Sequence, residues 1–237
     1  MYGIYMIASL AVMALSFYLQ YKLKSVFKKY SMVPTVGNIT GAQVAAAMLR
    51  DNGINDVKIV SVDGFLSDHY NPLNKTVNLS PEVYNGTSVT AAAVASHECG
   101  HAVQHATSYT WLTMRSGLVP ILEVSNRFTP WLIMGGMLLM GFARGSMFGG
   151  IGYFALLIGV LFFAVTTFFS FVTLPVEFDA SNRALAWLKT NNVTGLDHDK
   201  AAEALRWAGM TYVVAAVGSL IQLLYYVMIL LGNRDRR

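Results

Sequence analysis

Two histidines and a glutamate stand together in the string His97-Glu98-Cys99-Gly100-His101. Residues four apart on an α-helix project from one face, so the ring nitrogens of His97 and His101 can bind one metal ion. Glu98 can then take a proton from a metal-bound water. This HExxH pattern predicts a zinc site that hydrolyses peptide bonds. A string of this kind arises by chance in on the order of one per cent of chains this long, so its surroundings must support it.

The residues around the string favour a helix that can carry it. Ser88 offers a capping hydroxyl, and the alanine-rich residues after it are strong helix formers. We expect a helix over 89–106, with both histidines in its second half. The preceding segment, 74–80, alternates in polarity and predicts a short strand that can hold an extended peptide by edge pairing. A further helix is expected at 41–51 and a strand at 56–62.

A catalytic zinc ion needs a third protein ligand. His105 lies on the same helical face, but ligands at i, i+4 and i+8 cannot converge, since the outer pair is about 12 Å apart along the axis. His105 is therefore expected to support a ligand, to contact substrate, or to be the polar end of the helix. Glu123 and Glu177 are the carboxylate candidates. Glu177 is favoured, because it follows the strongest apolar segment, where a carboxylate is costly unless it is paired or metal-bound.

The composition indicates a membrane protein. Hydrophobic residues make up 54% of the 237 residues and charged residues only 13%, where a soluble domain has roughly a quarter charged. The apolar runs 2–21, 151–174 and 212–231 are each about long enough to cross a bilayer. The run 131–143 is shorter, and is a half-span, a buried helix or a span extended at both ends. The first run lacks a basic start and an evident cleavage site, so we interpret it as a retained anchor.

The positions of the basic residues predict which side of the membrane holds the zinc string. Four lysines follow the first run and none precedes it, which places residues 22–115 in the cytoplasm. The single cysteine, Cys99, is compatible with that reducing compartment and is expected to be a small core residue. The basic tail argues the other way if the chain crosses four times; its residues are Arg234, Arg236 and Arg237.

A third ligand at Glu177 constrains the topology, because zinc ligands must meet on one side of the bilayer. An even number of crossings must separate His101 from Glu177, so residues 128–146 must cross and pair with 150–174. The sequence thus predicts a mostly α membrane protein with about four transmembrane helices and a small α+β zinc-peptidase unit. Its expected parts are an anchor at 1–21, a catalytic region at 22–127, a transmembrane hairpin at 128–174, a helical segment with the third ligand at 175–209, and a last span with a basic tail at 210–237.

Three longer stretches, 68–84, 95–105 and 173–181, resemble the YugP-type neutral zinc metallopeptidases of bacterial membranes, and the likeness covers nearly the whole chain. The resemblance implies a zinc peptidase of the bacterial inner membrane, distantly similar to the HtpX and CAAX-processing proteases. In that wider group the third ligand lies in Glu-x-x-Ala-Asp. Glu177 matches this pattern, but Ser181 stands where the aspartate is expected. Asp179 can take over the orienting of a ligand histidine.

The expected function is an integral-membrane, zinc-dependent endopeptidase. Zn²⁺ is held by His97, His101 and Glu177, while Glu98 acts as general base. The further donor to the oxyanion is expected among His69, His105 and Tyr212. His69 has a simpler alternative role, which is to bond local backbone in a turn.

Two other classes of function compete with the peptidase as interpretations of this sequence. A membrane scaffold or partner protein would hold a structural zinc closed by a fourth ligand, Asp179 or His105, and would have no use for Glu98. A metal transporter would need ionisable residues inside its spans, and the three strongest runs have none. The expected partners are the lipid bilayer, a peptide or membrane-protein substrate, and regulatory or oligomeric membrane partners. Nucleic acid is not expected, because lipid headgroups account for the basic residues.

Overall fold

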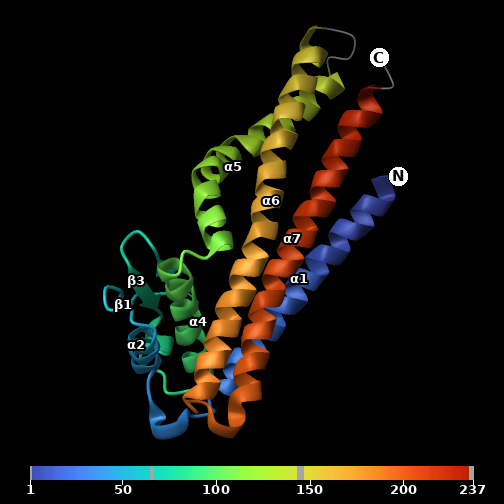
Figure 1. Cartoon of the computed structure of the whole chain (residues 1–237). Coiled ribbons are helices and arrows are strands. Elements are labelled where there is room, and N and C mark those ends of the chain that lie inside the picture. The colour runs from blue at the N-terminus through green and yellow to red at the C-terminus, as the bar shows by residue number, and fades with distance from the viewer. Residues whose placement is uncertain (1, 65–66, 143–146, 235–237) are drawn as a thin grey trace. The chain divides into compact units, whose positions relative to one another are not determined.

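The computed structural model describes residues 2–64, 67–142 and 147–234 and is mainly helical (Figure 1). By its internal contacts the chain divides into two compact units. The helical unit comprises Met1–Ser16, Met114–Thr173 and Tyr212–Arg237. The mixed unit comprises Phe17–Thr113 and Leu174–Thr211 and contains all of the strands. The favoured metal ligands, His97, His101 and Glu177, all lie in the mixed unit.

The helical unit is formed by parts of four long helices. They are α1 (Tyr2–Tyr30), α5 (Thr110–Phe142), α6 (Met147–Thr190) and α7 (His198–Arg234). By length and apolar composition, three helical segments within the described residues can cross a membrane: Gly3–Tyr30, Met147–Thr190 and Gly195–Gly232. The fold class is confirmed as a mostly α membrane protein with a small sheet.

The predicted count of about four spans is wrong by this criterion, because α5 does not meet it. The apolar part of α5 starts near Trp131, and at 1.5 Å per residue it covers roughly 18 Å of a hydrocarbon core about 30 Å thick. Arg115, Glu123 and Arg127 interrupt its first half. The rest of the predicted crossing at 128–146 lies outside the described residues.

Glycines let α5 and α6 pack closely within the helical unit. A Cβ atom on Gly136 would lie 2.6 Å from the backbone nitrogen of Leu156, and one on Gly152 would lie 2.8 Å from that of Met140. Only glycine allows two helix backbones to approach so closely. Polar groups of α5 also find partners on α6, since Thr166 donates to the Asn126 side-chain oxygen at 2.9 Å.

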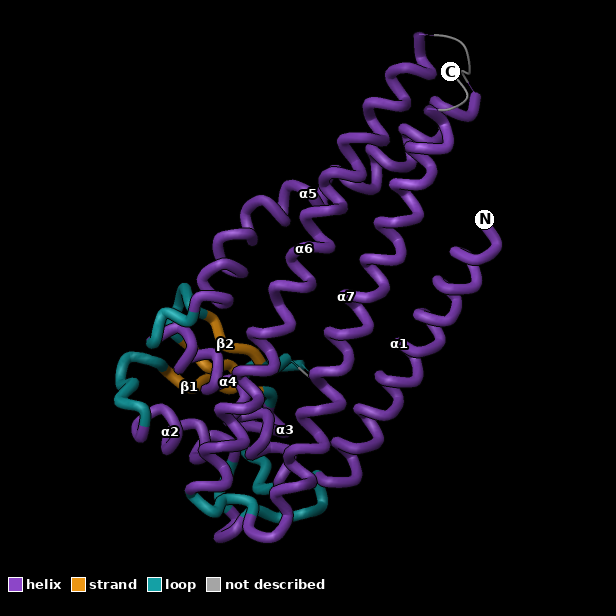
Figure 2. Tube along the Cα trace, turned by 45° about the vertical axis from the view of Figure 1, so that its right-hand side comes forward, coloured by secondary structure: helices purple, strands orange, loops and turns teal. Residues whose placement is uncertain are grey.

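The mixed unit contains a three-stranded sheet beside short helices (Figure 2). The central strand β3 (Thr76–Leu79) runs parallel to β1 (Lys58–Ser61) and antiparallel to β2 (His69–Asn71). The helices are α2 (Gly41–Asp51), α3 (Pro81–Tyr84) and α4 (Val89–Ala106). The predicted helices at 41–51 and 89–106 and the strands within 56–62 and 74–80 are confirmed. The expectation that the strand at 74–80 pairs with a peptide at a sheet edge is wrong, because β3 is the central strand and pairs on both sides. The prediction of a turn at His69 is wrong, because pairing with β3 keeps that segment extended up to Asn71.

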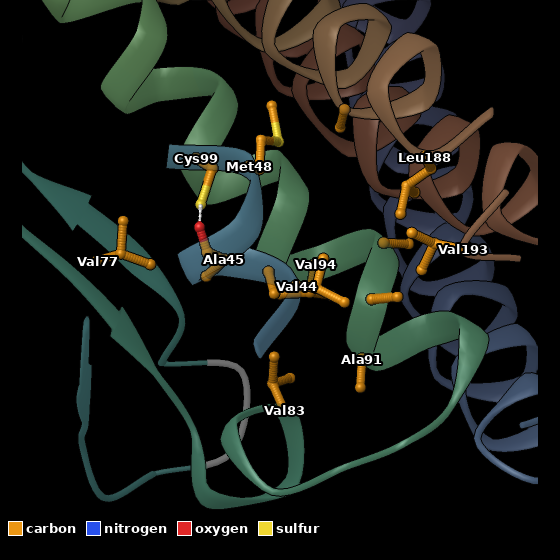
Figure 3. Packing of buried hydrophobic residues seen from close by; sticks show 14 of the residues in the cluster. Val44, Ala45, Met48, Val77, Val83, Ala91, Val94, Cys99, Leu188 and Val193 are labelled. Atoms are coloured by element: carbon orange, nitrogen blue, oxygen red, sulfur yellow. Dashed lines mark hydrogen bonds between the residues drawn. The ribbon is translucent and has the colours of Figure 1, made fainter. Parts of the chain in front are cut away.

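Helix α4 is the centre of the mixed unit's core. Its N-terminus is capped by Ser88, whose hydroxyl accepts the N–H of Ala91 at 3.2 Å. Most of its residues are buried against α2, β3 and the end of α6 (Figure 3). On one side the Cys99 thiol donates to the Ala45 carbonyl at 3.6 Å. Packing on nearly all sides fixes the rotation of α4, and with it the direction of its histidines.

Helix α6 continues where the sequence predicted a new element. It runs through Pro175 to Thr190, although proline has no N–H for the carbonyl one turn earlier. Fully buried residues at intervals of four hold this part of the helix in the core; they are Val176, Ala180, Ala184 and Leu188. Glu177 therefore lies inside a continuous helix and not in a first helical turn.

Candidate metal centre

The three predicted metal ligands come together in the mixed unit. His97 and His101 are on α4 and Glu177 is on α6. Nε2 of His97 lies 3.3 Å from Oε2 of Glu177, and Nε2 of His101 lies 3.6 Å from the same oxygen. The ligand atoms of all three residues lie within 4.8 Å of one another. Glu177 is only 3% exposed and His101 8%, so this is a nearly enclosed site.

Two of the distances between these atoms match those expected around a zinc ion. Zinc binds nitrogen and oxygen at about 2.0–2.2 Å, so neighbouring atoms of a tetrahedron around it are roughly 3.3–3.6 Å apart. The distances from Glu177 Oε2 to the two histidine nitrogens agree with this range. Two histidines and one glutamate are also a ligand set of catalytic zinc sites, which keep a fourth position open.

Gly100 brings α4 close enough to α6 for the ligands to meet. A Cβ atom on Gly100 would lie 2.6 Å from the carbonyl oxygen of Ala180 and 3.0 Å from its Cα. Any larger residue would push the two helices apart. Gly100 lies one residue before His101, and Ala180 lies one turn after Glu177, so this contact sets the distance between the ligands.

Each ligand histidine has a hydrogen-bond partner on its other ring nitrogen. Nδ1 of His97 lies 3.1 Å from Oγ of Ser181. Nδ1 of His101 lies 3.0 Å from Oε1 of Gln104. Ser181, which stands where the wider group has aspartate, therefore contacts His97 through its hydroxyl.

Asp179 contacts Gln104 and Arg183 in the described structure, and no hydrogen bond joins it to either ligand ring. Its Oδ2 accepts from Gln104 Nε2 at 2.8 Å and from Arg183 Nε at 2.6 Å. Sequence reasoning missed Gln104. The available signal was its position three residues after His101, which places both on one helical face.

Negative charge dominates the electrostatics at His101. Burial disfavours the charged imidazole, but the hydrogen bond and charge of Glu177 outweigh it, and Glu98 adds a smaller effect, so the pKa of His101 is raised in the metal-free site. The Glu98 side chain is itself buried. Glu98 follows His97 directly on α4 and stands three residues before His101.

The remaining candidate residues have other surroundings within their own units. His69 is exposed on β2, and its Nδ1 is 2.7 Å from the Ser67 carbonyl, which is a local backbone contact. His105 is exposed at the end of α4 and bonds the Tyr70 hydroxyl at 2.8 Å. Glu123 and Tyr212 belong to the helical unit, and Glu123 is not a member of the metal-binding group among the described residues.

Comparison with known proteins identifies the family of the chain. Residues 5–231 match the model of a family described as "Putative neutral zinc metallopeptidase". The chain belongs to this family. It is also 40% identical over 238 residues to the "Putative membrane protease YugP" of Bacillus subtilis (strain 168). This alignment covers 98% of this chain and 99% of that protein. No solved structure matches the chain.

The family confirms the predicted resemblance and the predicted metal. Zinc is the metal named for the family, and the chain has a group of residues that can hold it. The family and the relative support a protease function in general, and the relative and the apolar helices support membrane association.

Proposed function

We propose that the protein is an integral-membrane, zinc-dependent endopeptidase of the HExxH, gluzincin-like class. His97, His101 and Glu177 bind the zinc ion, and Glu98 is the general base. The observation that carries the proposal is the convergence of two histidine Nε2 atoms on one buried carboxylate oxygen. These ligands come from two helices far apart in the sequence.

The residues of the chain divide the chemistry between them. Zinc, when bound, supplies a Lewis acid that makes a water at its open position acidic near neutral pH. The Glu98 carboxylate would take a proton from the attacking water and deliver it to the leaving amine. Burial of Glu98 and the ligands keeps bulk water from competing for these proton transfers.

The edge of the sheet offers a place for an extended peptide. β2 pairs with β3 on one side only, so its other edge is unpaired within the described sheet. The Tyr70–His105 hydrogen bond joins β2 to the end of the metal-binding helix. His69, His105 and Tyr212 remain the candidates for substrate or oxyanion contact. One ring nitrogen is engaged in each histidine, by the Ser67 carbonyl in His69 and by the Tyr70 hydroxyl in His105.

A structural zinc site is less well supported. Such a site needs a fourth protein ligand, and only three residues form the metal-binding group in the described part of the chain. Asp179 bonds Gln104 and Arg183, and His105 bonds Tyr70, so both residues predicted to close the site have other partners.

The membrane and partner assignments complete the proposal. The protein is assigned to the bacterial plasma membrane, with the catalytic face in the cytoplasm because of the lysines that follow the first span. Its proposed substrate is a peptide or a membrane protein. The proposal also includes regulatory or oligomeric partners in the membrane.

The test compares wild type with Glu98→Gln for zinc content and for cleavage of unfolded casein in detergent. Both proteins should hold about one zinc ion per chain, because Glu98 is not a ligand. Cleavage by Glu98→Gln should fall by about 10²–10⁴-fold, the usual contribution of a general base. Glu82→Gln is the matched control, since Glu82 is exposed on α3 and outside the ligand group.

Two results would contradict the proposal. Wild type without bound zinc would overturn the metal centre. Equal cleavage by wild type and Glu98→Gln would remove Glu98 as the base. Stoichiometric zinc without cleavage in either protein would favour the structural-zinc alternative.

A further inference from the structure

Gln104 is a fully buried polar residue behind the metal ligands. Its side chain is 0% exposed, although burying an amide is costly unless it is hydrogen-bonded. Its Nε2 donates to the Val176 carbonyl at 2.7 Å and to Asp179 Oδ2 at 2.8 Å. Its Oε1 faces Nδ1 of His101 at 3.0 Å. All of these groups belong to the mixed unit.

The two contacts on α6 allow only one orientation of the Gln104 amide. The Val176 carbonyl and the Asp179 carboxylate are both acceptors, so the NH₂ group must face them. A flipped amide would place Oε1 against two acceptors. Oε1 is therefore left for His101, and because this oxygen has no proton, Nδ1 of His101 must carry one.

A proton on Nδ1 leaves the lone pair of neutral His101 on Nε2, the nitrogen that lies 3.6 Å from Glu177 Oε2. We propose that Gln104, oriented by Asp179 and the Val176 carbonyl, is a positioning residue that fixes the tautomer of His101 and directs its Nε2 at the zinc ion. This inference rests on the proposed ligand set. It gives Asp179 an orienting role that acts through Gln104 instead of by direct contact.

The other ligand histidine is held differently. Ser181 bonds Nδ1 of His97 through a hydroxyl, which can donate or accept. That contact does not select a tautomer, whereas the Gln104 contact does. Asp179 is itself fixed by Arg183, whose guanidinium lies 5.7 Å from the ring centre of Tyr109. Of the two histidines, only His101 therefore has its tautomer fixed by its hydrogen-bond partner.

The test uses the full-length protein in detergent and the variant Gln104→Met, which keeps a similar volume and cannot form the three hydrogen bonds. Zinc affinity is measured by competition with a chromophoric chelator, and the d–d spectrum of the Co²⁺-loaded protein reports ligand geometry. Ser96→Ala is the matched control, because Ser96 is also fully buried on α4 and bonds only the Ala93 carbonyl among the described residues. Unfolding of the metal-free proteins is followed in parallel.

We expect Gln104→Met to bind zinc about 10–100-fold more weakly than wild type, as for other partners of metal-bound histidines, with an altered Co²⁺ spectrum. Ser96→Ala should match wild type in both. A purely structural role predicts that Gln104→Met lowers the unfolding temperature but keeps the zinc affinity and the spectrum, and this result would overturn the inference. Wild type that binds no zinc would instead contradict the proposed metal centre.

A second measurement does not depend on the folding of the variant. Histidine-selective ¹⁵N NMR of the zinc-loaded wild type has only five histidines to assign. We expect His101 to show metal on Nε2 and an Nδ1 proton protected from exchange with water. Metal on Nδ1, or a rapidly exchanging Nδ1 proton, would overturn the inference.

Discussion

His97, Glu98 and His101 lie within five consecutive residues of one helix, α4. The spacing of His97 and His101 placed both on one face, because helical geometry is local. Gln104 was not identified, because its role depends on acceptors on α6 that are far away in the sequence. Ser181 shows the same limit, since only the structure places its hydroxyl beside His97.

Cys99 gives a prediction at the scale of single residues, because it lies between two ligands and yet points into the core. It is fully buried, and burial together with the charge of Glu98 raises the pKa of its thiol far above the usual range. Thiolate is the reactive form, so we expect no alkylation by N-ethylmaleimide in the native protein and one modified thiol per chain in denaturant. Mass spectrometry measures both. Rapid native labelling would contradict the predicted direction of Cys99.

At the scale of elements, the sequence predicted where α4 begins more accurately than it predicted where α6 continues. Helix α4 begins after its capping serine as predicted. Helix α6 was expected to restart at Pro175, but the buried residues on its next turns stabilise a continuous helix. A proline is a local signal, and tertiary packing can override it. The strand β2 was missed for a related reason, because its ladder with β3 is not visible in its own residues.

The contact between α4 and α6 can be tested with Gly100→Ala. The added methyl would meet Ala180 backbone at 2.6 Å, and backbone cannot move aside as a flexible side chain can. We expect a loss of about 1–3 kcal/mol in stability and weaker zinc binding, measured by thermal unfolding and chelator competition. Gly117→Ala is the control, since nothing lies within 4 Å of its added methyl. It should be neutral or stabilising by up to about 1 kcal/mol. Identical behaviour of the two variants would contradict the role of Gly100.

At the scale of the whole molecule, the metal site and the membrane topology constrain each other. The histidines and Glu177 meet in one unit, so an even number of crossings must separate them. Zero crossings also satisfies this condition. Of the two long helices between the ligands, only α6 has a segment long and apolar enough to cross a bilayer. Close packing of α5 on α6 at Gly136 and Gly152 gives the polar groups of α5 partners on α6.

This topology predicts which exposed positions a membrane-impermeant maleimide can reach in intact cells. Leu73 and Leu196 are exposed residues of the mixed unit, and Met147 is an exposed residue at the start of α6. The proposed topology, which rests on the lysines after the first span, has the mixed unit in the cytoplasm. Leu73→Cys and Leu196→Cys should therefore label only after permeabilisation. Met147→Cys should label in intact cells only if α5 and α6 cross the bilayer as a hairpin.

The native Cys99 can stay in place, because it is buried. Labelling of Leu73→Cys from outside would put the catalytic face on the other side of the membrane. Labelling of Met147→Cys only after permeabilisation would mean that α5 and the apolar part of α6 enter and leave the bilayer on the same side. The zinc ligands could still meet in that arrangement, because zero crossings is also an even number. The accessibility of Met147→Cys therefore distinguishes a crossing hairpin from a re-entrant one, and the zinc site alone does not.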